Sequence, residues 1–345
     1  MPRDIQSIAA DLRRAYSDFA PTPLLDLAAL ARHLGVAQVV AKDEGRRPLG
    51  SFKSLGGTYA GLQALARAAG TEIAELLGER RADLPALICA SDGNHGLAVA
   101  TAAQRAGAKA IVFLPAGISE IRLRRIEATG ARIERVAGSY DDAVDQAART
   151  ARQGAGILVS DTVPNPGDPI VEDVMAGYEI IAAEIREQIE AVGTPPPTHL
   201  FVQAGVGGLA AAVAQNLHGW MAAPERIVVV EPAQAACVTA ALSRGEVVRL
   251  PGEVETTAEM LSCGEASYPA FAMLKRLGVA CVSVSEDELN AIPHFIVAHG
   301  GPRTTPSGGA GIAGLRKAVE TQPGSFALDP ASRVLVIVSE RALEW

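Results

Sequence analysis

The sequence predicts an α/β protein made of two sheet domains. Short runs rich in valine, isoleucine and leucine alternate with alanine-rich segments of helical spacing, a pattern typical of buried parallel strands with helices on both faces. The 345 residues are enough for two domains, at about 150 residues each. Hydrophobic residues make up 48% of the chain and charged residues 20%, so a substantial core is expected and disorder is not.

The first part of the chain predicts two helices, a strand and a third helix. Residues 4–19 form the first helical pattern, and the prolines within 21–25 end it, since proline continues neither regular element. A second helical run covers 27–34. Residues 39–44 have the character of a strand, and the apolar spacing over 58–69 predicts the next helix.

The rest of the chain alternates between strand and helix. Proline clusters at 163–169 and 193–197 predict linkers between these elements. The apolar runs that we interpret as strands lie near 86–90, 110–114, 131–135, 156–159, 199–204, 226–231, 280–284 and 333–338.

Composition argues against several classes of function. The 39 acidic and 31 basic side chains give a net charge of −8, which disfavours nucleic acid as the main partner. Residues 1–6 lack the apolar core of a signal peptide, and no run approaches the roughly 20 apolar residues of a membrane helix. We therefore expect a cytoplasmic protein with no membrane partner. The cysteines show neither a CxxC pair nor a zinc spacing, so we expect buried thiols and no metal site: Cys89, Cys237, Cys263 and Cys281. A pairing of Cys237 with Cys263 is the alternative, which a reducing compartment disfavours.

The stretch GSFKSLGGTYA, residues 50–60, places Lys53 between a flexible loop and the small-residue start of a helix. A lysine in a desolvated pocket can form a Schiff base with a carbonyl cofactor, whereas an exposed lysine needs no particular neighbours. Gly50, Gly56 and Gly57 are expected to let the backbone approach a bulky ligand closely. Taken alone, the stretch is also compatible with a solvated surface lysine.

Two further stretches have the pattern of anion sites. SDGNHG at 91–96 and QAGVGGLA at 203–210 each follow an apolar run and precede a helical segment. Such a turn leaves backbone N–H groups at the helix N-terminus free to bind a phosphate or carboxylate. The second stretch also fits a dinucleotide fingerprint beginning at Gly205, with Glu231 as the ribose carboxylate. A tight turn that binds nothing is the remaining alternative.

In this order and spacing, the three stretches resemble the signature of fold-type II pyridoxal phosphate enzymes, which have the tryptophan synthase β-like fold. The resemblance implies a large cofactor-binding domain of residues 1–85 and 165–345, a small inserted domain of 86–164, and the cofactor in the cleft between them. The closest resemblance is to the diaminopropionate ammonia-lyase family, through FKSLGGTYA from Phe52, DGNHG from Asp92, Asp161-Thr162 followed by Gly177-Tyr178, Val230-Glu231-Pro232, and Cys263-Gly264-Glu265.

The resemblance implies that pyridoxal 5′-phosphate is the cofactor and gives each candidate residue a role. Lys53 would carry the cofactor as a Schiff base and, once displaced by the substrate amine, act as a base at Cα. Asn94 would bond the cofactor's 3′ oxygen, and Ser307 would face its pyridine nitrogen, unless Ser307 simply caps a helix. The phosphate would be bound by backbone N–H groups of Gly205, Val206, Gly207, Gly208 and Leu209.

Asp92 is the residue that most separates this family from its neighbours, because threonine and serine dehydratases typically have a serine or another small residue there. The resemblance implies that Asp92 is the base for the D-enantiomer; a turn aspartate capping the next helix is the alternative. Ser91 and the backbone of Asp92, Gly93 and His95 would hold the substrate carboxylate. His95 can equally be a structurally bonded histidine.

These observations predict an ammonia-lyase that eliminates ammonia from D- and/or L-2,3-diaminopropionate to give pyruvate, with a homodimer implied by the family. A serine or threonine dehydratase, or a β-replacement synthase of the same fold, is the first alternative. More distant alternatives are an NAD(P)-dependent oxidoreductase that uses the Gly205 loop, and a sensor that binds pyridoxal phosphate without turnover.

Overall fold

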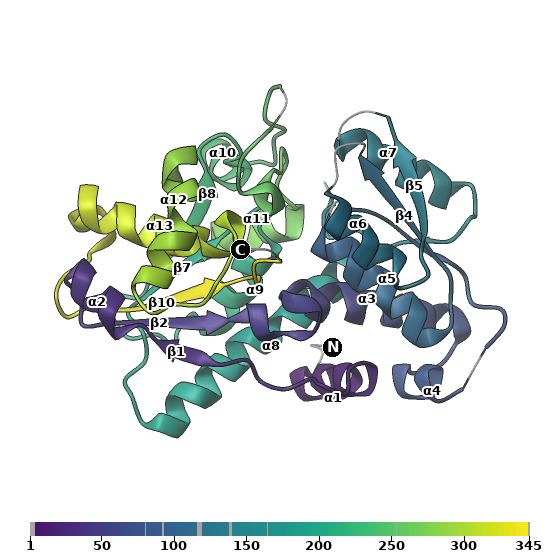
Figure 1. Ribbon diagram of the computed structural model, residues 1–345, viewed down its shortest axis with the longest axis horizontal. Coiled ribbons are helices and arrows are strands. Elements are labelled where there is room, and N and C mark those ends of the chain that lie inside the picture. Colours follow the sequence, from purple (N-terminus) through teal and green to yellow (C-terminus); the bar gives the residue numbers. More distant parts are fainter. Residues whose placement is uncertain are drawn as a thin grey trace. The chain divides into compact units, whose positions relative to one another are not determined.

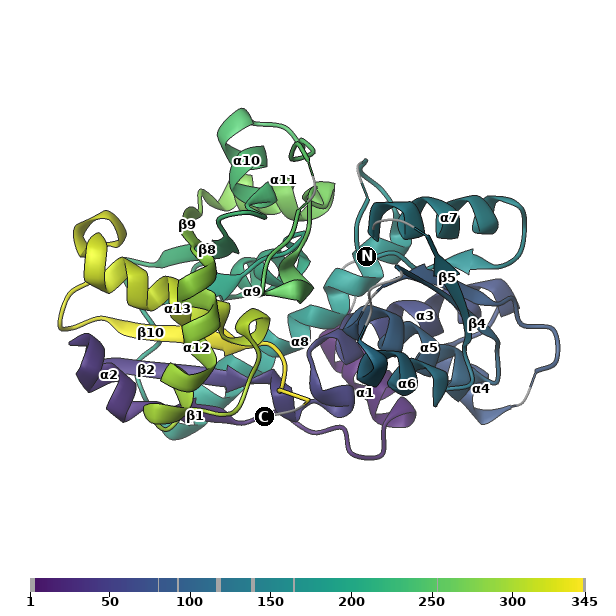
Figure 2. The same ribbon diagram turned by 45° about the horizontal axis from the view of Figure 1, so that its top comes forward.

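The computed structural model describes residues 4–79, 81–91, 93–115, 119–137, 140–163, 165–252 and 254–343. The chain divides into two compact units (Figures 1 and 2). Unit 1 comprises residues 1–20, 53–161 and 167–180, and unit 2 comprises 21–52, 162–166 and 181–345. The domain bounds expected from the family resemblance stay a prediction.

Unit 1 is built on a four-stranded parallel sheet with the strand order β5-β4-β3-β6. Ile88 of β3 pairs with Ile111 of β4 on one side and with Leu158 of β6 on the other. Ile88 also packs in a core cluster that includes Ala143 and Ala147 of α7. The strands are β3 (Leu87–Ala90), β4 (Ala110–Pro115), β5 (Arg132–Val136) and β6 (Ile157–Leu158).

Helices α3 and α5 of unit 1 pack closely against each other. A Cβ added to Gly61 would lie 2.8 Å from the Cβ of Ala102, and one added to Gly57 would lie 2.8 Å from the Cβ of Ala98. Small residues are therefore required along this face of α3. The helices of unit 1 are α1 (Ile5–Ala15), α3 (Lys53–Ala69), α4 (Ile73–Gly78), α5 (Asn94–Ala106), α6 (Glu120–Glu127), α7 (Tyr140–Arg152) and the first half of α8 (Pro169–Val192).

Unit 2 is built on a six-stranded sheet with the order β1-β2-β10-β7-β8-β9, in which only β1 is antiparallel to its neighbour. The run from Val334 to Val338 in β10 is fully buried, because this strand is central and both faces of the sheet are covered. The strands are β1 (Leu24–Asp26), β2 (Gln38–Asp43), β7 (His199–Gln203), β8 (Arg226–Pro232), β9 (Ala280–Val284) and β10 (Arg333–Val338).

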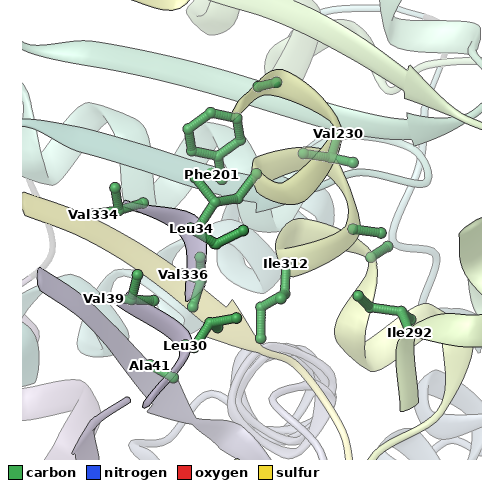
Figure 3. Close-up of a cluster of buried hydrophobic side chains, with 14 of the residues drawn as sticks. Leu30, Leu34, Val39, Ala41, Phe201, Val230, Ile292, Ile312, Val334 and Val336 are labelled. Carbon is green, nitrogen blue, oxygen red and sulfur yellow. The ribbon is translucent and has the colours of Figure 1, made fainter. Parts of the chain in front are cut away.

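The main core of unit 2 lies between its sheet and three helices: α2 (Ala28–Leu34), α12 (Glu286–Ala298) and α13 (Pro306–Thr321). Figure 3 shows Leu30, Ile292 and Ile312 from these helices beside Val39 and Val336 of the sheet. The remaining helical elements are α9 (Gly208–Leu217), α10 (Cys237–Arg244), α11 (Tyr268–Leu277), the second half of α8, η1 (Glu44–Arg46), η2 (Pro48–Gly50), η3 (Glu259–Leu261) and η4 (Pro323–Phe326).

The predicted α/β class is confirmed, and every run interpreted as a strand forms one. The short edge strand β1 is absent from the prediction, because the prolines beside it indicate a break; Leu24 nevertheless pairs with Lys42 of β2. The first helix ends at Ala15, earlier than predicted, because Tyr16 has an extended backbone. Among the described residues, no helix combines the length and the apolar character needed to cross a membrane.

Unit 2 buries a group of charged side chains beside β2. Arg47 donates to Glu44 and to Glu184, at 2.7 Å in each case. Lys42 lies 2.7 Å from Glu184, and the Thr22 hydroxyl donates to Glu44 at 2.6 Å. Burial raises the pKa of Glu44, but Arg47 and Lys42 outweigh burial and hold that pKa below its usual value. The group is therefore an ion network in which each charge depends on its partners.

We expect Arg47→Met to lower the free energy of unfolding by about 3–5 kcal/mol, because the change leaves Glu44 and Glu184 buried without their guanidinium partner. Urea unfolding at pH 7 measures the difference. Arg46→Met is the matched control: the Arg46 side chain is 76% exposed, and we expect a change within about 0.5 kcal/mol. Equal stability of Arg47→Met and the wild type would contradict the importance of this network.

Candidate active site

Lys53 is the first residue of α3, as the sequence predicts. The turn η2 precedes it, and both Leu49 and Gly50 have left-handed backbone there, with φ of 63° and 79°. The following residue, Ser51, is extended, with φ of −160°. A sharp local turn therefore sets where the helix starts, and the start of the helix places Lys53.

The Lys53 amine is paired with a carboxylate that follows β6. Its Nζ donates a short hydrogen bond to Oδ2 of Asp161, and the two side chains are only 20% and 14% exposed. Burial alone raises the pKa of Asp161, but the charge of Lys53 and the hydrogen bond from its amine outweigh burial and hold the pKa below its usual value. Asp161 is thus ionised at neutral pH, and its charge favours a proton on the Lys53 amine.

Tyr178 of α8 covers another side of the same amine. The centroid of its ring lies 6.0 Å from the Lys53 Nζ. The ring reaches this position because α3 and α8 touch: a Cβ on Gly56 would lie 2.5 Å from the ring's Cε1, and one on Gly177 would lie 2.7 Å from the Cα of Gly56. Burial raises the pKa of Tyr178 to about 12, so its hydroxyl keeps its proton.

The structure gives the glycines near Lys53 a different role from the ligand approach expected from the sequence. Gly56 and Gly57 let α3 pack closely on α8 and α5. A Cβ on Gly50 would lie 2.5 Å from Nε of Arg341, and its positive φ also favours glycine. All three therefore serve contacts inside the protein, because nearby side chains and backbone fill the space that a Cβ would need.

The turn before α5 presents the next group of predicted residues. Asp92 lies outside the described residues. Ser91 is buried, and its hydroxyl accepts a hydrogen bond from the N–H of Gly93 at 3.2 Å. Gly93 is the N-cap position and Asn94 is the first residue of the helix, so the backbone N–H groups of the first turn point out of the helix N-terminus. This end of α5 can bind an anionic group.

His95 is buried and makes a structural hydrogen bond. Its Nε2 lies 2.9 Å from the carbonyl oxygen of Val159, which fixes the proton on Nε2. Burial lowers the pKa of His95, so the imidazole is neutral at physiological pH. The alternative of a structurally bonded histidine thus has direct support, and substrate binding by His95 remains a prediction.

The glycine-rich loop of unit 2 runs from the end of β7 to the start of α9. Gly207 has φ of 96° and forms the N-cap, so the helix begins at Gly208. A Cβ on Gly205 would lie 2.9 Å from the Sγ of Cys263, so a larger residue there would force the Cys263 side chain to move. Because the first N–H groups of α9 have no acceptor within the helix, the loop fits a phosphate group. Val206 and Leu209 belong to the same segment.

Ser307 is the second residue of α13, and it does not cap the helix. Thr305 does so instead, since its hydroxyl accepts from the N–H of Gly308 at 2.9 Å. The Ser307 hydroxyl accepts from the N–H of Met260 at 3.1 Å. This bond uses a lone pair of the hydroxyl oxygen and leaves the hydroxyl proton to be donated, so Ser307 can serve as the predicted partner of the pyridine nitrogen.

Glu231 argues against the dinucleotide alternative. Its side chain is fully buried, and its oxygens accept hydrogen bonds from Val238 and Thr239 at the start of α10. A ribose carboxylate would instead need its oxygens open to a ligand. The Gly205 loop therefore lacks the acidic partner that this alternative requires of Glu231.

The cysteines are thiols, and burial raises the pKa of Cys89 and Cys237 well above the usual range. Within the part of the chain that the structure describes, no group of three or more histidine, cysteine or acidic side chains could hold a metal ion.

Asp161 is the residue that the sequence analysis missed as a site residue, although it lies in the Asp161-Thr162 match to the family. It is 108 positions from Lys53 along the chain. Its position in the chain could have indicated a site residue. Asp161 follows β6, which is the parallel neighbour of β3, and residues that follow adjacent parallel strands lie at the same edge of the sheet.

Three comparisons bear on this geometry. A family model described as pyridoxal-phosphate dependent enzyme matches residues 16–340. The chain is 34% identical over 342 residues to diaminopropionate ammonia-lyase of Salmonella typhimurium, covering 94% of this chain and 84% of that protein. Holo diaminopropionate ammonia lyase from Escherichia coli matches with a TM-score of 0.87 and 29% identity, covering 98% and 89% of the two chains. The E. coli enzyme with an aminoacrylate-PLP azomethine intermediate matches with a TM-score of 0.84 and 30% identity, covering 99% and 91%.

Proposed function

The chain belongs to the family of pyridoxal-phosphate dependent enzymes and, within it, to the diaminopropionate ammonia-lyases, and from this premise we propose that it converts D- and/or L-2,3-diaminopropionate to pyruvate and ammonia. The observation that carries this proposal is the 34% identity to the S. typhimurium enzyme across 94% of the chain. Elimination releases the β-amine as ammonia, and hydrolysis of the released aminoacrylate gives pyruvate and a second ammonia.

The cofactor is pyridoxal 5′-phosphate, which when bound supplies an electron sink for the electron pair left at the substrate Cα. In unit 1, Lys53 is assigned to the cofactor's aldehyde carbon and Asn94 to its 3′ oxygen. In unit 2, the backbone N–H groups of the Gly205–Leu209 loop are assigned to the phosphate. The Ser307 hydroxyl is assigned to the pyridine nitrogen; being neutral, it does not hold a proton there as a carboxylate would.

Proton transfer is assigned to Lys53 with Asp161 as its partner. The free amine of Lys53 takes the proton from Cα of one enantiomer, and the ionised Asp161 stabilises the resulting ammonium and orients Nζ. The same Nζ returns the proton to the leaving β-nitrogen. Asp92 is assigned as the base for the D-enantiomer, and Ser91, Gly93 and His95 are assigned to the substrate carboxylate.

The test is product stoichiometry with purified enzyme and added pyridoxal phosphate. D- and L-2,3-diaminopropionate, D- and L-serine and L-threonine are supplied in turn, and pyruvate, 2-oxobutyrate and ammonia are measured. We expect two ammonia molecules per pyruvate from at least one diaminopropionate enantiomer. Turnover of serine or threonine alone, with one ammonia per oxo acid, would instead identify a dehydratase. Binding of pyridoxal phosphate without any turnover would identify a sensor.

The family resemblance also supports a homodimer in the cytoplasm as part of the proposal. Sedimentation equilibrium of the holoenzyme at micromolar concentration tests the first statement, and a mass near the 35.7 kDa of one chain would contradict it. Fractionation of the source cells tests the second.

A further inference from the structure

Glu231 lies in β8 and binds the first turn of α10. Its Oε1 accepts from the N–H of Val238 at 2.7 Å, and its Oε2 accepts from the N–H and the hydroxyl of Thr239 at 2.8 and 2.6 Å. The N-cap residue of α10 is Ala236, which has no side-chain oxygen. The fully buried Glu231 carboxylate therefore takes the place of a capping side chain for this helix.

The same turn of α10 touches the glycine-rich loop. The Sγ of Cys237 donates to the carbonyl oxygen of Gly205 at 3.4 Å. Beside it, Cγ2 of Val238 lies 3.2 Å from where a Cβ on Gly207 would stand. Val238, whose N–H donates to Glu231, therefore packs directly on the loop, and Cys237 beside it hydrogen-bonds to the loop's backbone.

Two further bonds fix the direction of the loop's peptide groups. The N–H of Ser267 donates to the carbonyl oxygen of Val206 at 2.9 Å. The N–H of Ala204 donates to the carbonyl oxygen of Val230, the residue before Glu231, also at 2.9 Å. In a trans peptide the N–H points opposite to the carbonyl. Holding the carbonyls of Gly205 and Val206 against the protein therefore directs the N–H groups of Val206 and Gly207 away from it, toward a bound anion.

We propose that Glu231 is a positioning residue for phosphate binding: through α10, its carboxylate holds the Gly205–Gly207 backbone with the N–H groups directed at the cofactor's phosphate. The inference rests on the proposed function only in taking this loop as the phosphate site. Because its fully buried carboxylate is bonded to α10, Glu231 acts on the phosphate through the helix and the loop.

The protonation of Glu231 gives the proposal a pH signature. Burial raises its pKa to about 7, while its hydrogen bonds to Thr239 and Val238 act in the opposite direction. The titratable groups that face it are Cys237 and Cys281, and both stay protonated near neutrality because burial raises their pKa values too. Protonation removes the charge of Glu231 and turns one of its oxygens into a hydroxyl, which accepts hydrogen bonds more weakly, so its binding of α10 weakens as the pH falls through 7.

The experiment compares the affinities of the full-length protein for pyridoxal 5′-phosphate and for pyridoxal, which lacks the phosphate. The Glu231→Gln side chain has one acceptor oxygen and places its NH₂ group against the donors of Thr239. At pH 8.5 we therefore expect the Kd of this variant for pyridoxal phosphate to rise about tenfold. Its Kd for pyridoxal should stay within about twofold of the wild-type value. The two proteins' Kd values for pyridoxal phosphate should converge below pH 7. Glu288→Gln is the matched control, because Glu288 caps α12 through Ser285.

Equal weakening of both ligands, or of neither, would overturn the proposal, as would a wild type that does not prefer the phosphorylated ligand. If Glu231→Gln does not fold by circular dichroism, Thr239→Val removes the hydroxyl bond to Glu231 and keeps both backbone N–H bonds. This variant should raise the ratio of the Kd for pyridoxal phosphate to the Kd for pyridoxal about threefold; an unchanged ratio would overturn the proposal. Wild-type turnover, measured on the same preparations, reports separately on the proposed function, so a failure of one is distinguished from a failure of the other.

Discussion

Replacing Lys53 with alanine is expected to abolish the covalent attachment of pyridoxal phosphate and to lower kcat for diaminopropionate by at least about 10³-fold. The side chain is the proposed attachment point and also the proposed base, so the variant loses both functions. The visible absorption spectrum before and after borohydride reduction measures the attachment, because reduction makes a Lys53–cofactor bond permanent and detectable by peptide mass.

Lys317→Ala is the matched control for this prediction. Lys317 is a partly exposed lysine of unit 2 that pairs with Glu288 at 3.1 Å, and its loss should leave spectrum and kcat unchanged. A Lys53→Ala protein that still carries cofactor fixed by borohydride at another lysine would refute the assignment. A wild type that stays colourless after addition of pyridoxal phosphate would refute the cofactor site itself.

Asp161→Asn is expected to lower kcat by about 10²-fold while pyridoxal phosphate remains bound. The carboxylate receives the hydrogen bond of the Lys53 amine, and the amide has nearly the same shape but no charge to stabilise an ammonium. The KM for diaminopropionate should change much less than kcat, because Asp161 is not assigned to substrate binding. Steady-state kinetics of the two proteins tests this, and a loss confined to KM would contradict the assignment.

The pH dependence of stability provides a second readout for Asp161. Its pKa is held below the ordinary value of 3.8, chiefly by Lys53 against the effect of burial. A carboxyl with a lowered folded-state pKa stabilises the fold above its unfolded pKa and loses this contribution as the pH falls through the folded value. The Tm difference between wild type and Asp161→Asn should therefore be constant from pH 5 to 8 and shrink in more acidic solution. A difference that grows toward acid would mean that the pKa is raised instead.

The sequence was sufficient for features that depend on short stretches of chain. Apolar periodicity located the strands, and glycine spacing placed Lys53 at the start of α3 and the Gly205 loop between β7 and α9. The edge strand β1 was not predicted, because its three residues follow two prolines and depend on pairing with β2. Prediction from the sequence therefore succeeded for elements that form through backbone preference and local burial. It failed for β1, whose strand conformation depends on pairing with another strand.

Partners distant in sequence were decided by the tertiary structure. Asp161 reaches Lys53 across 108 positions, Glu231 binds α10 instead of a nucleotide, and Thr305 rather than Ser307 caps α13. Gly56 likewise serves the contact of α3 with α8. Composition and spacing thus determined the α/β class, the elements and the residues capable of the chemistry. Only the folded chain determined which of those residues meet, because hydrogen bonds and charge pairing depend on distance through space, which local sequence does not encode.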